Sequence, residues 1–171
     1  GTMENYIAAK ARIFENQTEN DFCVLNYDND ITRAMEKQPR SRIIWFSRQV
    51  KLPGGVFIEE GNIVSAEDDG KHVICRPDEV KIPGVHNLEN ALAATALARC
   101  YKIPADVIRH TLMTFPGVKH RIEFVREIDG VRYINDSKGT NPDATEKAAA
   151  AMTRPTVIIM GGYDKNSSFD Q

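Results

Sequence analysis

The sequence has few cysteines and no long apolar run, and each absence excludes a class of protein. Only three of its 171 residues are cysteine, Cys23, Cys75 and Cys100, and no CxxC pair occurs. Such a scattered, odd-numbered set argues against a disulfide framework and a zinc site, so we expect reduced, partly buried thiols. No apolar stretch approaches the roughly 20 residues that span a bilayer. The first residues also lack the charged-then-apolar layout of a signal peptide.

The chain also has little net charge. It carries 22 basic and 24 acidic residues, for a formal net charge of −2. Without a polybasic field, we expect neither nucleic acid nor a membrane as a partner. The Walker A pattern GxxxxGK[ST] does not occur in these residues, so any nucleotide-binding hypothesis must place the phosphate cradle elsewhere. What is present is an ordinary globular composition, 42% hydrophobic and 27% charged, in a chain long enough to bury a core.

Residues 1–114 show helical and strand-like patterns in turn. Apolar periodicity and capping residues predict helices at 3–14, 87–101 and 104–114, and a further helix that starts at Asp28 or Asp30 and ends at Met35. Short apolar runs predict strands at 22–26, 43–46, 56–58, 63–64 and 72–75. A polar turn at 59–62 is expected to join the third and fourth of these strands as a hairpin.

The chain changes character after residues 115–117, which we interpret as a linker. Alternating apolar residues on both sides of Asp129-Gly130 predict a second hairpin. Pro142 then favours a helix, because proline suits the first helical position. That helix leads to an apolar run at 156–160, which predicts a buried parallel strand. The fold class is therefore α/β, with domains at 1–117 and 118–171, the second being the start of a doubly wound domain.

Two polar loops follow predicted strands, at the edge where open α/β sheets bind ligands. The first runs from Asn135 to Asn141 and the second from Gly161 to Lys165. Each contains glycine and lysine, which suits an anionic ligand near a helix N-terminus. The alternative interpretation is a capped turn whose charges are solvated.

Two further patterns place polar side chains where a ligand could bind. Asn87 and Asn90 share one face of a predicted helix, and their amides suit the edge of a purine base. Helix capping by Asn87 explains the same pattern without a ligand. Arg121 follows the linker, from which a guanidinium could reach phosphates.

In their order and spacing, these segments resemble the Mur ligases, and among them the members that add D-glutamate. The matching segments extend over essentially the whole chain: Ala8–Lys10, Val24–Asp28, Gly84–Ala91, Phe115–Glu123, Asn135–Asn141 and Gly161–Lys165. The HNxxNA and HRxE patterns at His86 and His120 are shared with folylpolyglutamate synthases. The NDSKxTNP segment that begins at Asn135 is more specific to the D-glutamate-adding members. The DNPR signature of the members that add meso-diaminopimelate is absent.

The resemblance implies an ATP-dependent ligase with ATP and Mg²⁺ as cofactors. Its substrates would be UDP-N-acetylmuramoyl-L-alanine and D-glutamate, joined through an acyl phosphate in peptidoglycan precursor synthesis, and hence in cell-wall biogenesis, cell shape and cell division. The parent enzyme is expected to be cytoplasmic, monomeric and built from three domains. Residues 1–117 would belong to its central P-loop-type ATPase domain and 118–171 to its Rossmann-like C-terminal domain. We expect this piece alone to be inactive.

The resemblance also implies roles for residues of the first predicted domain. Lys10 matches a lysine that is carbamylated and then helps to hold Mg²⁺ through oxygen. Unmodified, Lys10 would be an ordinary lysine on a helix surface. Asn87 and Asn90 match contacts to adenine.

In the second predicted domain, Asp136 matches a contact to the ribose of ATP. Arg121 and Lys138 match contacts to its phosphates. Thr140 and Lys165 match groups that hold the α-carboxylate of D-glutamate. Two alternatives stay open: another Mur- or folylpolyglutamate-type amide ligase, and a non-catalytic nucleotide-binding module.

Overall fold

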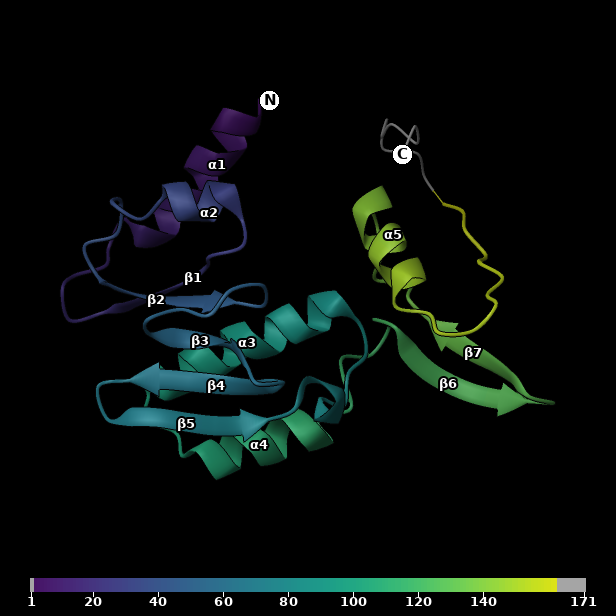
Figure 1. Ribbon diagram of the computed structural model, residues 1–171. Coiled ribbons are helices and arrows are strands. Elements are labelled where there is room, and N and C mark those ends of the chain that lie inside the picture. The colour runs from purple at the N-terminus through teal and green to yellow at the C-terminus, as the bar shows by residue number, and fades with distance from the viewer. Residues whose placement is uncertain (1, 163–171) are drawn as a thin grey trace. The chain divides into compact units, whose positions relative to one another are not determined.

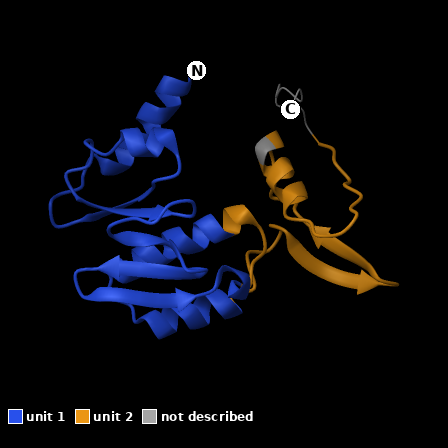
Figure 2. Cartoon of the chain, viewed as in Figure 1, with its two compact units in different colours: residues 1–80, 88–114 blue, residues 81–87, 115–171 orange. Residues whose placement is uncertain are grey.

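The computed structural model describes residues 2–162, without the side chain of Asp143. The chain divides into two compact units (Figure 2). Unit 1 comprises residues 1–80 and 88–114, and unit 2 comprises residues 81–87 and 115–171. The chain therefore leaves unit 1 for the last time after Thr114, next to the segment interpreted as a linker. The assignment of residues 1–117 and 118–171 to two domains stays a prediction.

Unit 1 is built on a five-stranded sheet in the order β1-β2-β3-β4-β5 (Figure 1). Its strands are β1 Phe22–Asn26, β2 Arg42–Ser47, β3 Gly55–Glu59, β4 Asn62–Glu67 and β5 Gly70–Cys75. The first three strands are parallel, whereas β3, β4 and β5 pair in antiparallel fashion. The helices are α1 Met3–Ala11, α2 Asp30–Ala34, α3 Val85–Cys100 and α4 Ala105–Thr114, with 3-10 turns η1 Arg12–Phe14 and η2 Pro77–Glu79. The helices and strands predicted for residues 1–114 are thus confirmed, with α3 starting two residues early.

Apolar clusters form on both faces of this sheet. Successive side chains of a strand point to opposite faces, so Val24 packs into a different cluster from Cys23 and Leu25. The largest cluster joins α3 and α4 to the sheet through Phe46, Val56, Ile63, Ile74, Cys75, Leu92, Ala96 and Ile108. A second cluster packs Phe14 of η1 and Met35 against Cys23 and Leu25. A third consists of Leu52, Phe57 and Val64.

Both predicted hairpins are confirmed, and each has a two-residue turn in the left-handed region. The φ angles are 50° and 76° at Glu60-Gly61, and 50° and 80° at Asp129-Gly130. Positive φ at both central positions is typical of the type I′ turn, whose twist matches that of the paired strands. Glycine at the second position adopts this conformation without a steric cost.

Besides the start of α3, the described part of unit 2 contains a hairpin and one helix. The antiparallel strands β6 Glu123–Ile128 and β7 Val131–Asn135 pair with an irregularity between Phe124 and Arg126. Helix α5 spans Pro142–Ala150, and the Oδ1 of its N-cap residue Asn141 accepts a hydrogen bond from the Ala144 N–H at 2.8 Å. Proline at the first helical position therefore starts the helix as predicted.

The predicted strand at 156–160 is wrong. This segment has no regular secondary structure, and Val157 and Ile159 are more than nine-tenths exposed. A parallel strand needs a neighbour that pairs its backbone groups and a layer that buries its side chains. Within residues 2–162 no strand pairs with this segment, because the two-stranded sheet of unit 2 contains β6 and β7 alone.

The cysteines agree with the prediction of unpaired, partly buried thiols. Cys23 and Cys75 are buried and Cys100 is half-buried, and none forms a disulfide. Burial raises the pKa of the Cys23 and Cys75 thiols to about 11, because the apolar surroundings disfavour the charged thiolate. Among the helices of the described region, none has the length and hydropathy needed to cross a membrane.

Candidate functional site: the loop after β7 and the turn before β6

In unit 2, the polar loop 135–141 is bonded to the turn at 118–122. The Lys138 N–H donates a hydrogen bond to the carbonyl of His120 at 2.9 Å. The Ile122 N–H donates to Oδ1 of the Asp136 carboxylate at 3.0 Å. Arg121 lies between these two anchor points in the chain. The structure therefore places Arg121 on a turn that is bonded to the loop carrying Asp136 and Lys138, which follow it by 15 and 17 positions in the sequence.

A glycine allows the loop to close around Asp136. The Gly139 N–H donates to the carbonyl of Asp136 at 2.8 Å, which makes a tight turn. A Cβ atom on Gly139 would lie 2.6 Å from Oδ2 of Asp136, far inside ordinary contact distance. Because residue 139 is glycine, it places no Cβ against Oδ2 of Asp136, the carboxylate oxygen that does not accept the hydrogen bond from Ile122. No sequence pattern predicted this role of Gly139, although the residue directly follows Lys138.

The turn that carries Arg121 has a strained backbone. His120 and Ile122 have φ angles of 67° and 46°, and this region is rare for a β-branched residue. Hydrogen bonds compensate: the His120 N–H donates to Oε2 of Glu123 at 2.7 Å, and the His120 Nδ1 lies 3.0 Å from the Asn135 amide nitrogen. These hydrogen bonds hold the strained backbone of the turn and so limit the positions that Arg121, between His120 and Ile122, can adopt. The HRxE pattern includes His120, but it did not predict that His120 would anchor this turn through hydrogen bonds.

The charges on this surface are open to solvent. Arg121, Lys138 and Thr140 are exposed, and Asp136 is half-buried. Between residues 2 and 162, no carboxylate pairs with the guanidinium of Arg121 or the ammonium of Lys138. Thr140 immediately precedes Asn141, the N-cap of α5, where the helix dipole favours negative charge. Two unpaired cations, a carboxylate and a helix N-terminus can together bind a polar, anionic molecule.

Asn87 and Asn90 both lie on α3, one turn apart. Asn87 is buried, and its Nδ2 donates to the carbonyl of Pro83 at 2.6 Å, whereas Asn90 is exposed. Because α3 starts at Val85, Asn87 stands within the first turn and not at the N-cap. Asn87 is therefore not the N-cap residue of α3. Its side-chain amide instead donates a hydrogen bond to the carbonyl of Pro83, which precedes the helix.

Lys10 is exposed on α1, and its Nζ lies 5.4 Å from the ring centroid of Tyr6. A hollow of about 210 Å³ lies beside it, lined by Met3, Tyr6, Ile7, Lys10, Asn29, Ile31, Thr32 and Met35. In the described chain, no group of three His, Cys, Asp or Glu side chains is arranged to hold a metal ion. The residues around Lys10 thus do not by themselves fit a Mg²⁺ ion. Lys165 lies outside the described residues.

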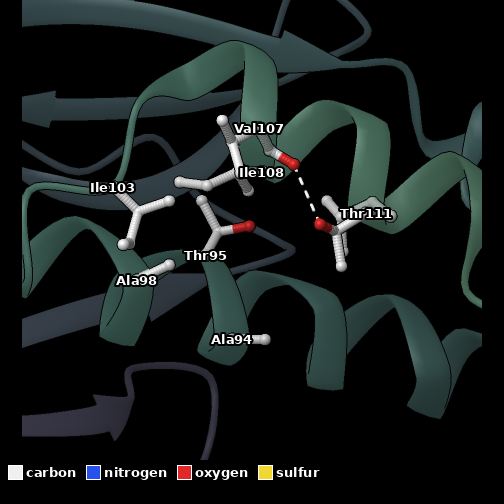
Figure 3. A pocket seen from close by; sticks show the side chains of 8 residues that line it. Ala94, Thr95, Ala98, Ile103, Val107, Ile108 and Thr111 are labelled. Carbon is white, nitrogen blue, oxygen red and sulfur yellow. Dashed lines mark hydrogen bonds between the residues drawn. The ribbon is translucent and has the colours of Figure 1, made fainter.

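A second hollow in unit 1, of about 250 Å³, lies between α3 and α4 (Figure 3). Its lining is apolar apart from the hydroxyls of Thr95 and Thr111. Both hydroxyls are bonded to carbonyls of their own helices, Thr95 to Ala91 at 2.8 Å and Thr111 to Val107 at 2.9 Å. With no charged group in its lining, this hollow offers nothing to phosphates or carboxylates, and we interpret it as imperfect helix packing.

The segment that contains the sheet of unit 1 matches a known family of domains. Residues 1–98 match the family described as the Mur ligase middle domain, and the chain therefore belongs to the Mur ligase family. The resemblance inferred from the motifs is confirmed.

Relatives within this family carry a more specific name. The chain is 52% identical over 170 residues to the UDP-N-acetylmuramoylalanine--D-glutamate ligase of Clostridioides difficile (strain 630), covering 99% of this chain and 38% of that protein. It is 52% identical over 169 residues to the protein of the same name from Pelotomaculum thermopropionicum, covering 99% and 37%. The chain thus spans less than two-fifths of the length of these relatives.

Solved structures show the same fold at low sequence identity. MurF from Acinetobacter baumannii superposes with a TM-score of 0.70 at 22% identity, covering 87% of this chain and 33% of that one. The folylpolyglutamate synthetase from Lactobacillus casei gives a TM-score of 0.57 at 15% identity, covering 91% and 42%. The predicted α/β fold class is confirmed.

Proposed function

We propose that this chain is part of a cytoplasmic, ATP-dependent ligase that joins D-glutamate to UDP-N-acetylmuramoyl-L-alanine in peptidoglycan precursor synthesis. The observation that carries the proposal is identity above 50% across 99% of the chain to proteins named as this ligase. The charged loop of unit 2 adds a chemical reason, since it suits a nucleotide or a carboxylate. Residues 1–117 are proposed to belong to the central ATPase domain and 118–171 to the C-terminal domain of a monomeric enzyme.

The proposed reaction has two steps. The terminal phosphoryl group of ATP passes to the carboxylate of UDP-N-acetylmuramoyl-L-alanine, which forms an acyl phosphate and releases ADP. The amine of D-glutamate then attacks the acyl carbon, and inorganic phosphate leaves as the amide forms. Positioning and charge neutralisation account for most of the catalysis in such phosphoryl transfers. A Mg²⁺ ion is expected in the whole enzyme; of the described residues, carbamylated Lys10 would supply one oxygen ligand, and no group of three His, Cys, Asp or Glu side chains among them could hold the ion.

The loop and turn of unit 2 are proposed to meet both ligands. Asp136 would accept hydrogen bonds from the ribose hydroxyls through Oδ2, because Oδ1 is held by the Ile122 N–H. Arg121 and Lys138 would neutralise phosphate charge, since their side chains are exposed and carry no carboxylate partner in the described chain. Thr140, beside the N-terminus of α5, would bind the α-carboxylate of D-glutamate together with Lys165.

On α3, Asn90 is proposed to contact adenine together with Asn87, one turn earlier in the helix. Lys10 is proposed to be the lysine that carbamylation converts into an oxygen ligand. Its exposed position on α1 leaves the amine accessible to carbon dioxide.

The function is tested by an amino-acid screen on the full-length protein that contains this chain. Phosphate release is measured with ATP, UDP-N-acetylmuramoyl-L-alanine and one amino acid at a time: D-glutamate, L-glutamate, glycine, L-lysine or meso-diaminopimelate. We expect release to depend on D-glutamate, and no turnover from the 171-residue chain by itself. Preference for another amino acid would instead support the alternative of a related amide ligase.

The site assignment is tested by measuring how each single substitution changes the KM for ATP and the KM for D-glutamate. Lys138→Ala is expected to raise the KM for ATP about tenfold or more, because one charge-assisted hydrogen bond contributes about 1.5–3 kcal/mol. Thr140→Val should raise the KM for D-glutamate and leave that for ATP within twofold. Arg126→Ala, an exposed cation on β6, is the control and should change neither. The assignment fails if Lys138→Ala and Arg126→Ala behave alike.

A further inference from the structure

A polar loop after β2 joins the carboxyl ends of two parallel strands of unit 1. Ser47 is fully buried at the end of β2, and its Oγ donates to Oδ1 of Asp28 at 2.5 Å. The Arg48 N–H donates to Oδ2 of the same carboxylate at 2.7 Å. Asp28 stands just beyond β1, so both of its oxygens are used to hold the start of this loop. The loop therefore has a fixed origin at the edge of the sheet.

The rest of the loop is also held. The Ser47 Oγ accepts hydrogen bonds from the N–H groups of Gln49 at 3.1 Å and Val50 at 2.9 Å. Leu52, which is 6% exposed, packs with Phe57 and Val64 in the third apolar cluster. Because the loop is anchored on both sides of Arg48, the backbone of that residue forms a rigid base for its long side chain.

From this base, Arg48 reaches α3. Its Nε lies 3.3 Å from Oε1 of Glu89, and each side chain is 32% exposed. Glu89 directly precedes Asn90, the residue proposed to contact adenine. The neighbouring Leu88 and Leu92 hold α3 against the sheet through apolar contacts, which have little directional preference. An ion pair between defined atoms adds direction, and so limits how this turn of α3 can shift along or around its axis.

We propose that Arg48 and Glu89 form a positioning pair, which sets the turn of α3 that bears Asn90 for contact with the adenine of ATP. This inference rests on the proposed function and adds two residues that the family resemblance does not assign. The pair acts through Asn90 and does not itself touch the nucleotide. Its loss is therefore expected to weaken ATP binding and to leave the later chemistry largely intact.

The test is a charge exchange in the full-length protein. Arg48→Glu and Glu89→Arg are made singly and together, and the Kd for ATP, the kcat and the KM for D-glutamate are measured for each. Each single change should raise the Kd for ATP about fivefold, with kcat and the KM for D-glutamate within twofold of wild type. The double exchange should bring the Kd for ATP back to within twofold, because the pair is restored with its charges reversed.

The exposed pair Arg42–Asp68 serves as the matched control, with Nη1 and Oδ2 2.7 Å apart and side chains 51% and 82% exposed. Arg42→Glu should leave the Kd for ATP within twofold. If the single reversals fail to fold, Arg48→Gln and Glu89→Gln replace them, with a smaller rise expected from each. The inference is overturned if the single changes leave the Kd for ATP unaltered, or if the double exchange fails to restore it. A wild-type protein that lacks D-glutamate-dependent turnover but binds ATP would instead count against the proposed function.

Discussion

Replacing Gly139 by alanine tests the geometry of the loop around Asp136. The added Cβ would lie 2.6 Å from Oδ2 of Asp136, whereas ordinary contacts start at 3.4 Å, so the carboxylate must retreat by about 0.8 Å, the difference of the two distances. We expect such a shift to weaken the hydrogen bond from the Ile122 N–H to Oδ1 and to move the carboxylate away from the ribose that it is proposed to bind. A hydrogen bond to a charged group contributes about 1.5–3 kcal/mol, which corresponds to roughly a 10- to 100-fold loss of ATP affinity if Asp136 holds the ribose.

The assay is the KM for ATP of the full-length Gly139→Ala protein, with the melting temperature as a check on folding. Gly54→Ala is the matched control, because its Cβ would meet the Ala66 carbonyl oxygen at an ordinary 3.6 Å. In an Asp136→Ala background, Gly139→Ala should have little further effect on the KM, since the group it displaces is already gone. A Gly139→Ala protein with wild-type affinity for ATP would contradict this role of Asp136, as would a full additional loss in the double mutant.

The remaining predictions concern packing and protonation. Leu92 is fully buried and Leu97 is half-exposed on the same helix. Leu92→Ala should therefore lower the free energy of unfolding by about 2–5 kcal/mol, and Leu97→Ala should lower it by under about 1 kcal/mol. Equal losses for the two variants, measured by urea titration, would contradict the placement of α3. With a pKa of about 11, Cys23 should react with iodoacetamide at pH 8 at least about 100-fold more slowly in the folded chain than after denaturation, since the thiolate is the reacting form. Because the folded pKa lies above the unfolded one, the thiol's contribution to stability is complete below about pH 9 and is lost as pH rises toward 11. Wild-type and Cys23→Ala proteins with parallel stability curves from pH 8 to 11 would contradict this.

Local patterns predicted the elements of unit 1 because each depends on nearby residues. The turn at Glu60-Gly61 and the Ala-rich run of α3 are examples, since a left-handed turn and a run of helix-forming residues are visible within a few positions. The order of the five strands was not predicted, because strand pairing joins residues far apart in the chain. The strand at 156–160 failed for the same reason: its formation depends on partners, and apolar composition does not supply them.

The candidate site, like the fold, was predicted only in part. The motifs predicted Arg121, Asp136 and Lys138 as site residues, which stays a prediction, and the structure shows that these residues lie on two segments bonded to each other. The bonds themselves had no sequence signal. A carboxylate fixed by the Ile122 N–H and a strained φ at that same residue arise from the meeting of two segments, and neither segment encodes them alone.

The central claim is that this chain belongs to a ligase that activates a carboxylate with ATP for attack by D-glutamate. The most direct measurement uses UDP-N-acetylmuramoyl-L-alanine with its carboxylate labelled by ¹⁸O, turned over by the full-length protein with ATP and D-glutamate. An acyl phosphate carries one carboxylate oxygen into the leaving phosphate, so the account predicts one ¹⁸O per phosphate and an amide product bearing one D-glutamate. Unlabelled phosphate, or product formed equally well without D-glutamate, would contradict it.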